Sequence, residues 1–106
     1  MPTGSVKAWK TLDFARINLV CLRNLPDLLA AWLPDGRAMG GEWVARNPTR
    51  DDRRAGSFRI NMTNGRWADF ATHDRGGDPI SLYAYLNRLG QAQAARALCD
   101  LWGGDR

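Results

Sequence analysis

The side chains best suited to chemistry lie between residues 69 and 78. Asp69, Asp74 and Asp78 are close enough to suggest a magnesium site, because hard carboxylate oxygens bind a metal that carries phosphates. Structural roles explain them better: Asp78 precedes Pro79 as a helix N-cap does, Asp74 suits a turn, and Asp69 suits a hydrogen bond to the backbone or to an arginine. No serine or cysteine stands beside the single histidine, His73, as a partnered nucleophile. We therefore expect no catalytic residues and no enzyme.

The two cysteines form neither a disulfide pattern nor a metal-binding pattern. Cys21 and Cys99 lie far apart, each within an apolar helical pattern, which predicts reduced core residues. A zinc site needs about four nitrogen or sulfur ligands, and His73 has no cysteine or second histidine near it. We expect no metal and no cofactor.

Arginine dominates the basic residues of the chain. Lys7 and Lys10 are the only lysines among its 15 basic residues, and the net charge is +4. Seven arginines and three acids lie between Arg37 and Arg66, a local excess that equals the whole net charge. Guanidinium suits bidentate phosphate contacts and stacking on bases. Arginine in place of lysine is equally what a GC-rich genome would encode, so both explanations stay open.

The elements that must position these residues follow from periodicity. Apolar spacing near the helical period predicts helices over residues 12–25 and 26–33, and again over 80–89 and 91–102. Between them, short apolar or alternating segments predict strands at 42–46, 57–62 and 67–71, with Asn64-Gly65 as a hairpin turn. We therefore predict an α+β fold, a three-stranded antiparallel meander packed with two N-terminal and two C-terminal helices.

Length and composition predict one domain. The 106 residues, 44% of them hydrophobic, fit a single core over residues 12–103, with residues 1–11 as a flexible N-terminus. The sequence has no apolar run of membrane-spanning length and no apolar signal-peptide core, so we expect a cytoplasmic protein that does not contact membranes.

One face of the predicted meander favours nucleic acid. Arg59 and Asn61 alternate with Phe58, Ile60 and Met62, so they point to solvent beside the loop of residues 50–54. Arginines of such a face would meet phosphates and an aromatic ring could stack a base. The predicted contacts are Arg46, Arg50, Arg53, Arg54, Arg59, Asn61, Arg66 and, as the stacking ring, Trp67. The alternative is an ordinary solvated face, with Trp67 in the core and the acids Asp51 and Asp52 partly neutralising their neighbours.

A family resemblance rests on four short landmarks. These are Asn47-Pro48-Thr49-Arg50, Gly56-Ser57-Phe58, Asp69-Phe70-Ala71-Thr72 and Gly76-Gly77-Asp78. In order and spacing they resemble the Cys-Pro-x-His, Pro-Ser-Phe, Cys-x-x-Cys and Gly-Gly-Asp elements of the CHC-type zinc-finger domain of bacterial and phage DNA primases. All four zinc ligands differ here, because Asn47, Arg50, Asp69 and Thr72 stand at their positions. The longer span 12–102 is similar to the N-terminal regions of primase-helicases from phages, plasmids and integrated elements.

The resemblance implies a zinc-ribbon-like sheet without zinc, in which helices supply the stability that metal gives to small finger modules. We expect the sheet residues Trp43, Phe58, Ile60 and Phe70 to be buried against Leu29, Trp32, Leu82 and Leu98. The four residues at the ligand positions should also lie close together in space, with Arg50 contacting Asp69.

The function that the resemblance implies is a noncatalytic accessory module that binds nucleic acid, with single-stranded DNA as its partner. Its setting would be DNA replication or primer synthesis of a phage, plasmid or integrated mobile element, beside a primase, polymerase or helicase subunit. The alternative is a protein-interaction or inhibitor module that docks on a replication or host-defence protein.

Overall fold

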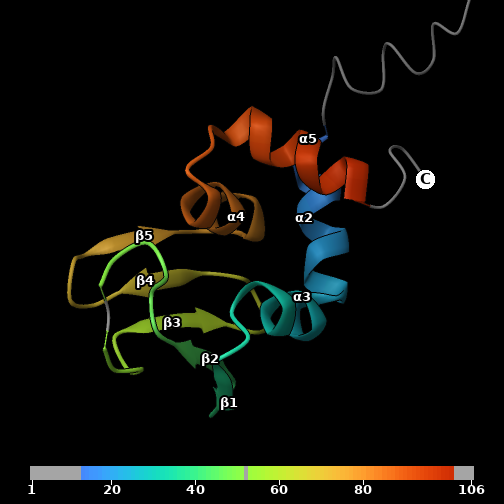
Figure 1. Ribbon diagram of the computed structural model, residues 1–106. Coiled ribbons are helices and arrows are strands. Elements are labelled where there is room, and N and C mark those ends of the chain that lie inside the picture. Colours follow the sequence, from blue (N-terminus) through green and yellow to red (C-terminus); the bar gives the residue numbers. More distant parts are fainter. Residues whose placement is uncertain (1–12, 52, 102–106) are drawn as a thin grey trace, which may run out of the picture.

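The computed structural model describes residues 13–51 and 53–101, and this part of the chain has an α+β fold with four helices and five strands. Figure 1 shows the helices beside one antiparallel sheet. The elements are α2 (Phe14–Arg23), α3 (Leu25–Trp32), β1 (Arg37–Met39), β2 (Glu42–Ala45), β3 (Phe58–Asn61), β4 (Trp67–Asp69), β5 (Asp74–Gly76), α4 (Pro79–Asn87) and α5 (Gln91–Leu101). The predicted flexible N-terminus, residues 1–11, lies outside the described residues, as do residues 12, 102 and 103.

The sheet is a meander in which each strand pairs antiparallel with the next, in the order β1-β2-β3-β4-β5. The prediction of three strands was therefore wrong, since β1 and β5 add an edge strand on either side. Both are three residues long, and neither contains a buried residue. Without a buried position they show no apolar alternation, which is the sequence signal for a strand.

Local turn chemistry sets the register of β3 and β4. The Asn61 side chain accepts hydrogen bonds from the amides of Thr63 and Asn64, and Gly65 adopts the left-handed region with φ of 75°. A Cβ on Gly65 would lie 2.8 Å from Cδ of Pro79, so a glycine is required there for both reasons. The predicted Asn64-Gly65 hairpin is confirmed.

One face of the sheet is covered by α3 and α4. Ala45, Phe58, Ile60 and Trp67 face Leu25, Leu29 and Leu33 from the α3 segment and Leu82 from α4, in one core cluster. Strand alternation places Val44, Arg59 and Ala68 on the opposite side, and this outer face contributes nothing to either core cluster. The sheet thus has a helix-covered core face and an outer face.

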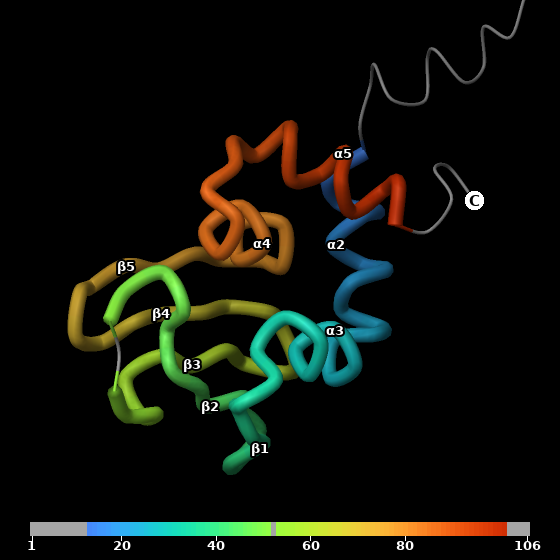
Figure 2. The backbone as a smooth tube through the Cα atoms, viewed as in Figure 1, coloured from blue at the N-terminus to red at the C-terminus, as the bar shows by residue number. Residues whose placement is uncertain are grey.

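A second core lies between the helices alone. Residues of α2, α4 and α5, together with Leu28 of α3, form a buried cluster around Cys21 and Leu98. Figure 2 shows how α2 runs from α5 down to α3, so that the helical half extends away from the sheet. Leu98 therefore packs within the helices, not against the sheet as predicted.

One further core prediction needs correction. Trp43 is half-buried and packs against the core cluster of the sheet, whereas Phe70 is 64% exposed. Asp69 faces the core, and consecutive residues along a strand direction point to opposite faces. Phe70, the next residue, therefore points away from the core. Phe58 and Ile60 are fully buried, as predicted.

Two smaller predictions are confirmed. Asp78 caps α4: its carboxylate accepts from the amide of Ser81 at 2.8 Å, in a reciprocal capping box. Cys21 is a buried core residue, as predicted, whereas Cys99 is half-buried. No helix of residues 13–51 and 53–101 has the length and apolar character that crossing a bilayer requires.

Candidate nucleic-acid interface

The four residues at the resembled ligand positions converge at one end of the core face. Asp69 is fully buried and receives Nε and Nη2 of Arg50 at 2.8 and 3.2 Å, a bidentate ion pair. Nδ2 of Asn47 donates to the same carboxylate at 2.9 Å, and the amide of Thr72 donates to the Asp69 carbonyl oxygen at 3.2 Å. The predicted proximity and the predicted Arg50–Asp69 contact are both confirmed.

This polar network joins three parts of the fold. Asn47 and Arg50 lie in the loop between β2 and β3, and Asp69 ends β4. Tyr85 of α4 accepts from Nδ2 of Asn47 at 2.8 Å and donates its hydroxyl to Asp74 at 2.7 Å. No buried side-chain nitrogen or oxygen among the described residues lacks a hydrogen-bond partner. The network therefore holds the loop against both the sheet and α4 without an unsatisfied polar group.

The ionisation of Asp69 is fixed by these contacts. Burial alone would raise the pKa of its carboxyl, since it disfavours the charged form. The hydrogen bonds from Arg50, Asn47 and the Ala71 amide, with the Arg50 charge, outweigh burial and hold the pKa well below its usual range. Asp69 is therefore a carboxylate near neutral pH.

The same residues do not fit a zinc ion. Zinc in structural sites takes thiolate, imidazole or carboxylate ligands, and a guanidinium is always protonated and has no free lone pair. Arg50 puts a positive charge where the resembled family has a ligand. Across residues 13–51 and 53–101, no three His, Cys, Asp or Glu side chains are grouped so that they could hold a metal. The network is thus a structural ion-pair cluster.

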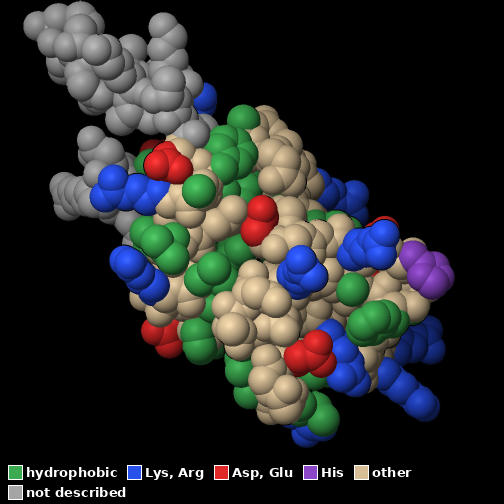
Figure 3. All heavy atoms as spheres, turned by 180° about the vertical axis from the view of Figure 1, so that it is seen from behind, with side chains coloured by type: hydrophobic (Ala, Val, Ile, Leu, Met, Phe, Trp, Pro, Cys, Tyr) green, Lys and Arg blue, Asp and Glu red, His purple; other side chains and the backbone are tan. Residues whose placement is uncertain are grey.

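A row of arginines crosses the outer face of the sheet. Strand pairing aligns Arg37 with Val44, Val44 with Arg59, Arg59 with Ala68 and Ala68 with Arg75. Directly paired residues point to the same face, so one arginine stands on every second strand, roughly 10 Å from the next. We call Arg37, Arg59 and Arg75 the arginine row. Figure 3 shows basic side chains gathered over the sheet half of the molecule.

The row has small apolar residues between its charges. Val44 is only 3% exposed, although it belongs to neither core cluster. Arginine stems readily cover apolar neighbours while the guanidinium stays in water, and Arg37 and Arg59 flank Val44. The outer face therefore carries the small apolar residues Val44 and Ala68 between its three arginines.

Ion pairs engage three of the predicted contact residues. Arg46 pairs with Asp35 at 2.8 Å, and both side chains are well exposed. Arg59 pairs with Glu42 at 3.2 Å and donates to the Gly56 carbonyl. Arg50 pairs with Asp69 in the polar network. Arg53, Arg54 and Arg66 are exposed.

Two of the predicted contacts have structural roles. Asn61 holds the β3–β4 turn through its side-chain oxygen. Trp67 is 5% exposed, donates its indole N–H to Ser81 Oγ at 2.9 Å, and lies 4.5 Å from the Tyr85 ring centre. The assignment of Trp67 as a base-stacking ring was wrong, because strand alternation places it on the core face beside Phe58 and Ile60.

Sequence reasoning missed the aromatic that is accessible. Phe70, His73 and Arg75 line a hollow of about 360 Å³ at the β4–β5 turn, together with Ala68, Asp69 and Asp74. The turn itself depends on His73, whose φ of 68° is in the left-handed region. One sequence signal could have identified Phe70. The strand alternation that starts at the core residue Trp67 places Ala68 and Phe70 on the face opposite to the core.

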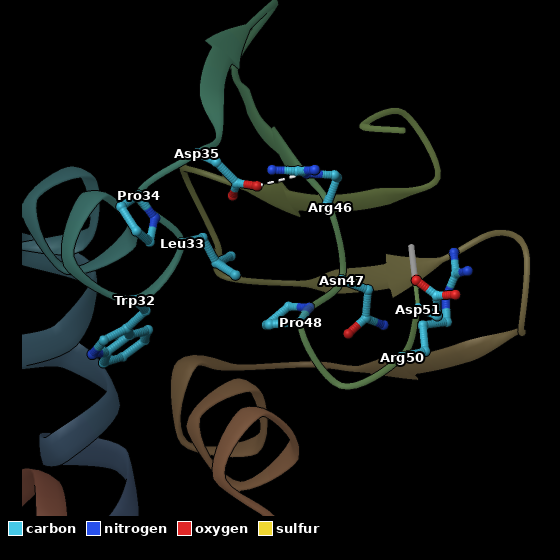
Figure 4. Close-up of a pocket in the computed structure, with 9 residues that line it drawn as sticks. All are labelled: Trp32, Leu33, Pro34, Asp35, Arg46, Asn47, Pro48, Arg50 and Asp51. Carbon is cyan, nitrogen blue, oxygen red and sulfur yellow. Dashed lines mark hydrogen bonds and ion pairs between the residues drawn. The ribbon is translucent and has the colours of Figure 1, made fainter. Parts of the chain in front are cut away.

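A second hollow, of about 240 Å³, lies between the end of α3 and the start of the β2–β3 loop (Figure 4). Arg46 and Asp35 face each other across it, while Trp32 and Pro48 contribute apolar walls. Two arginines, Arg46 and Arg50, and two aspartates, Asp35 and Asp51, line this hollow, so its charges favour neither an anion nor a cation.

Comparison of the chain with protein-family models, curated proteins and solved structures finds no match.

Proposed function

We propose that this chain is a noncatalytic module that binds nucleic acid, a zinc-free relative of the primase zinc-binding domain that acts in DNA replication of a phage, plasmid or integrated element. The observation that carries the proposal is the arginine row, because it aligns three guanidinium groups on a sheet face without helices. Charge in this arrangement suits a phosphate backbone that crosses the strands.

The row is available to a ligand. Arg37 and Arg75 are exposed and have no ion-pair partner among the residues that the structure describes. The Arg59–Glu42 pair is partly exposed on both sides, at 38% and 35%. Such surface pairs contribute about 0–1 kcal/mol, so a phosphate can compete for Arg59.

The polar network supports the proposed kinship. Asn47, Arg50, Asp69 and Thr72 stand where the resembled family has its four zinc ligands. Asn47 and Arg50 bind the buried Asp69 carboxylate, and the Thr72 amide binds the Asp69 carbonyl oxygen. An ion-pair cluster in place of the metal explains how the loop and the hairpin end could keep their relation without zinc. Helices α3 and α4 then supply the apolar burial that a small finger module lacks.

A salt titration tests the proposal. Binding of labelled single-stranded and duplex DNA is measured across salt concentrations, and each lost single-strand phosphate contact lowers the slope of log K against log salt by about 0.7. Arg59→Ala/Arg75→Ala should reduce the single-strand slope by about 1.4, and Arg53→Ala/Arg54→Ala tests the neighbouring loop. The matched control is Arg16→Ala/Arg23→Ala on α2, which removes the same charge from the helical half.

Two results would refute the proposal. Absence of binding at about 50 mM salt would exclude nucleic acid as the partner and favour the protein-interaction alternative. An equal loss of slope in the α2 control would show that binding follows total charge and not the arginine row.

A further inference from the structure

Phe70 is the most exposed large hydrophobic residue of the described chain, at 64%. Its position is nevertheless well fixed. The Phe70 amide donates to the Ser57 carbonyl at 2.8 Å, and the preceding residue, Asp69, is fully buried in the polar network. The aromatic ring is therefore exposed to solvent on a backbone that is hydrogen-bonded to Ser57, the residue before β3, and this lowers the entropic cost of binding to the ring.

The hollow beside Phe70 suits a flat, uncharged group. Its volume of about 360 Å³ falls in the range of about 300 to 1,000 Å³ that small-molecule sites show. Asp74 is one of the residues that line the hollow, so a phosphate placed inside it would lie beside an acidic residue. Arg75, which lines the same hollow, belongs to the arginine row. The charges therefore favour a base within the hollow and a phosphate along the row.

We infer that the hollow at the β4–β5 turn is a base-binding site, in which Phe70 stacks one unpaired nucleobase while Arg75 holds an adjacent phosphate. This inference rests on the proposed function and specifies its substrate as single-stranded nucleic acid. A base within a duplex is stacked on both faces, so only a single strand or a frayed end presents a free face to Phe70.

The experiment compares three ligands of about 15 nucleotides, a length that a small binding domain can cover. These are oligothymidylate, a duplex, and an oligonucleotide whose bases are replaced by abasic sites. Phe70→Ala should weaken oligothymidylate binding about 5- to 150-fold, the loss that removal of one stacking contact produces, with little change for the other two ligands. Phe70→Trp should retain the affinity, and its added fluorescence should be quenched by oligothymidylate but not by the abasic strand.

Leu19→Ala is the matched control, because Leu19 is 49% exposed and lies on α2. It should bind all three ligands like the wild type. Thermal unfolding of each variant verifies that the fold is retained, which the exposure of both side chains makes the expected result.

The outcomes separate the two proposals. If Phe70→Ala binds oligothymidylate like the wild type while Arg59→Ala/Arg75→Ala loses affinity, the base-binding site is wrong and the nucleic-acid function stands. If the wild type binds abasic and base-bearing strands equally, stacking is likewise excluded. If the wild type binds no nucleic acid at about 50 mM salt, both proposals fail.

Discussion

Removal of the Arg50 side chain should destabilise the fold severely, because it leaves the Asp69 carboxylate buried without its cation. Breaking a buried ion pair from one side costs about 3–5 kcal/mol, a large part of the roughly 5–15 kcal/mol that stabilises a domain. For Arg50→Ala we therefore expect the urea midpoint to fall by at least about 1 M, given an m-value of about 1–3 kcal/mol/M.

Arg46→Ala is the control for this experiment. The Arg46–Asp35 pair has the same 2.8 Å distance as Arg50–Asp69, but its side chains are 50% and 41% exposed. Arg46→Ala should therefore lower the free energy of unfolding by less than about 1 kcal/mol. If Arg50→Ala costs no more than Arg46→Ala, the polar network does not stabilise the fold and the reasoning is refuted.

The pH dependence of stability gives a second measurement on the same carboxyl. The folded-state pKa of Asp69 lies below its unfolded value of about 3.9. Its contribution to stability is therefore complete above about pH 4 and is lost as pH falls toward the folded pKa. Asp69→Asn should lower stability near neutral pH and remove this part of the acid sensitivity. In an Arg50→Met background, Asp69→Asn should cost less than in the wild type, because no cation is then lost.

Three further predictions concern the rest of the molecule. Gly65→Ala should lower the free energy of unfolding, measured in urea, by more than about 1 kcal/mol, because φ is 75° and a Cβ would contact Pro79. Its control, Gly77→Ala, should change the free energy of unfolding very little, because a Cβ there has no atom within 4 Å. Burial, with the Asp78 charge adding to it, raises the pKa of the Cys21 thiol to about 12, so alkylation detected by mass spectrometry should require denaturant. Protein purified without chelator should contain far less than one equivalent of zinc, and chelator should leave the melting temperature unchanged; stoichiometric zinc would contradict the ion-pair network.

The sequence predicted those elements whose conformation depends on residues close to them in the chain. The alternation around Phe58 and Ile60 reflects one buried face, and the Asp78 cap needs only the amides of its own helix. The edge strands could not be predicted in this way, because β1 and β5 owe their conformation to pairing with a neighbour. Arg37 and Arg75 joined the arginine row only when that pairing was known.

The two aromatics of the hairpin show the limit of reasoning from residue type. Trp67 and Phe70 both suit a core and both suit a stacking surface, so their chemistry does not distinguish the roles. The direction of β4 decides: Trp67 points to the helices beside Ile60, and Phe70 follows a buried aspartate and points outward. Trp67, predicted as a stacking ring, therefore lies in the core, and Phe70, predicted in the core, is exposed.

The buried Asp69 carboxylate and the arginine row proposed to bind nucleic acid lie on opposite faces of one sheet. Asp69 faces the core and orders the β4–β5 turn through its carbonyl, which accepts the amides of Thr72 and His73. Phe70, the next residue, is directed outward by the same strand. The network therefore supports the outer site by fixing its backbone, although none of its side chains belongs to the arginine row. A substitution within the network, such as Asp69→Asn, should lower stability and nucleic-acid binding together, whereas loss of Arg59 and Arg75 should weaken binding at full stability.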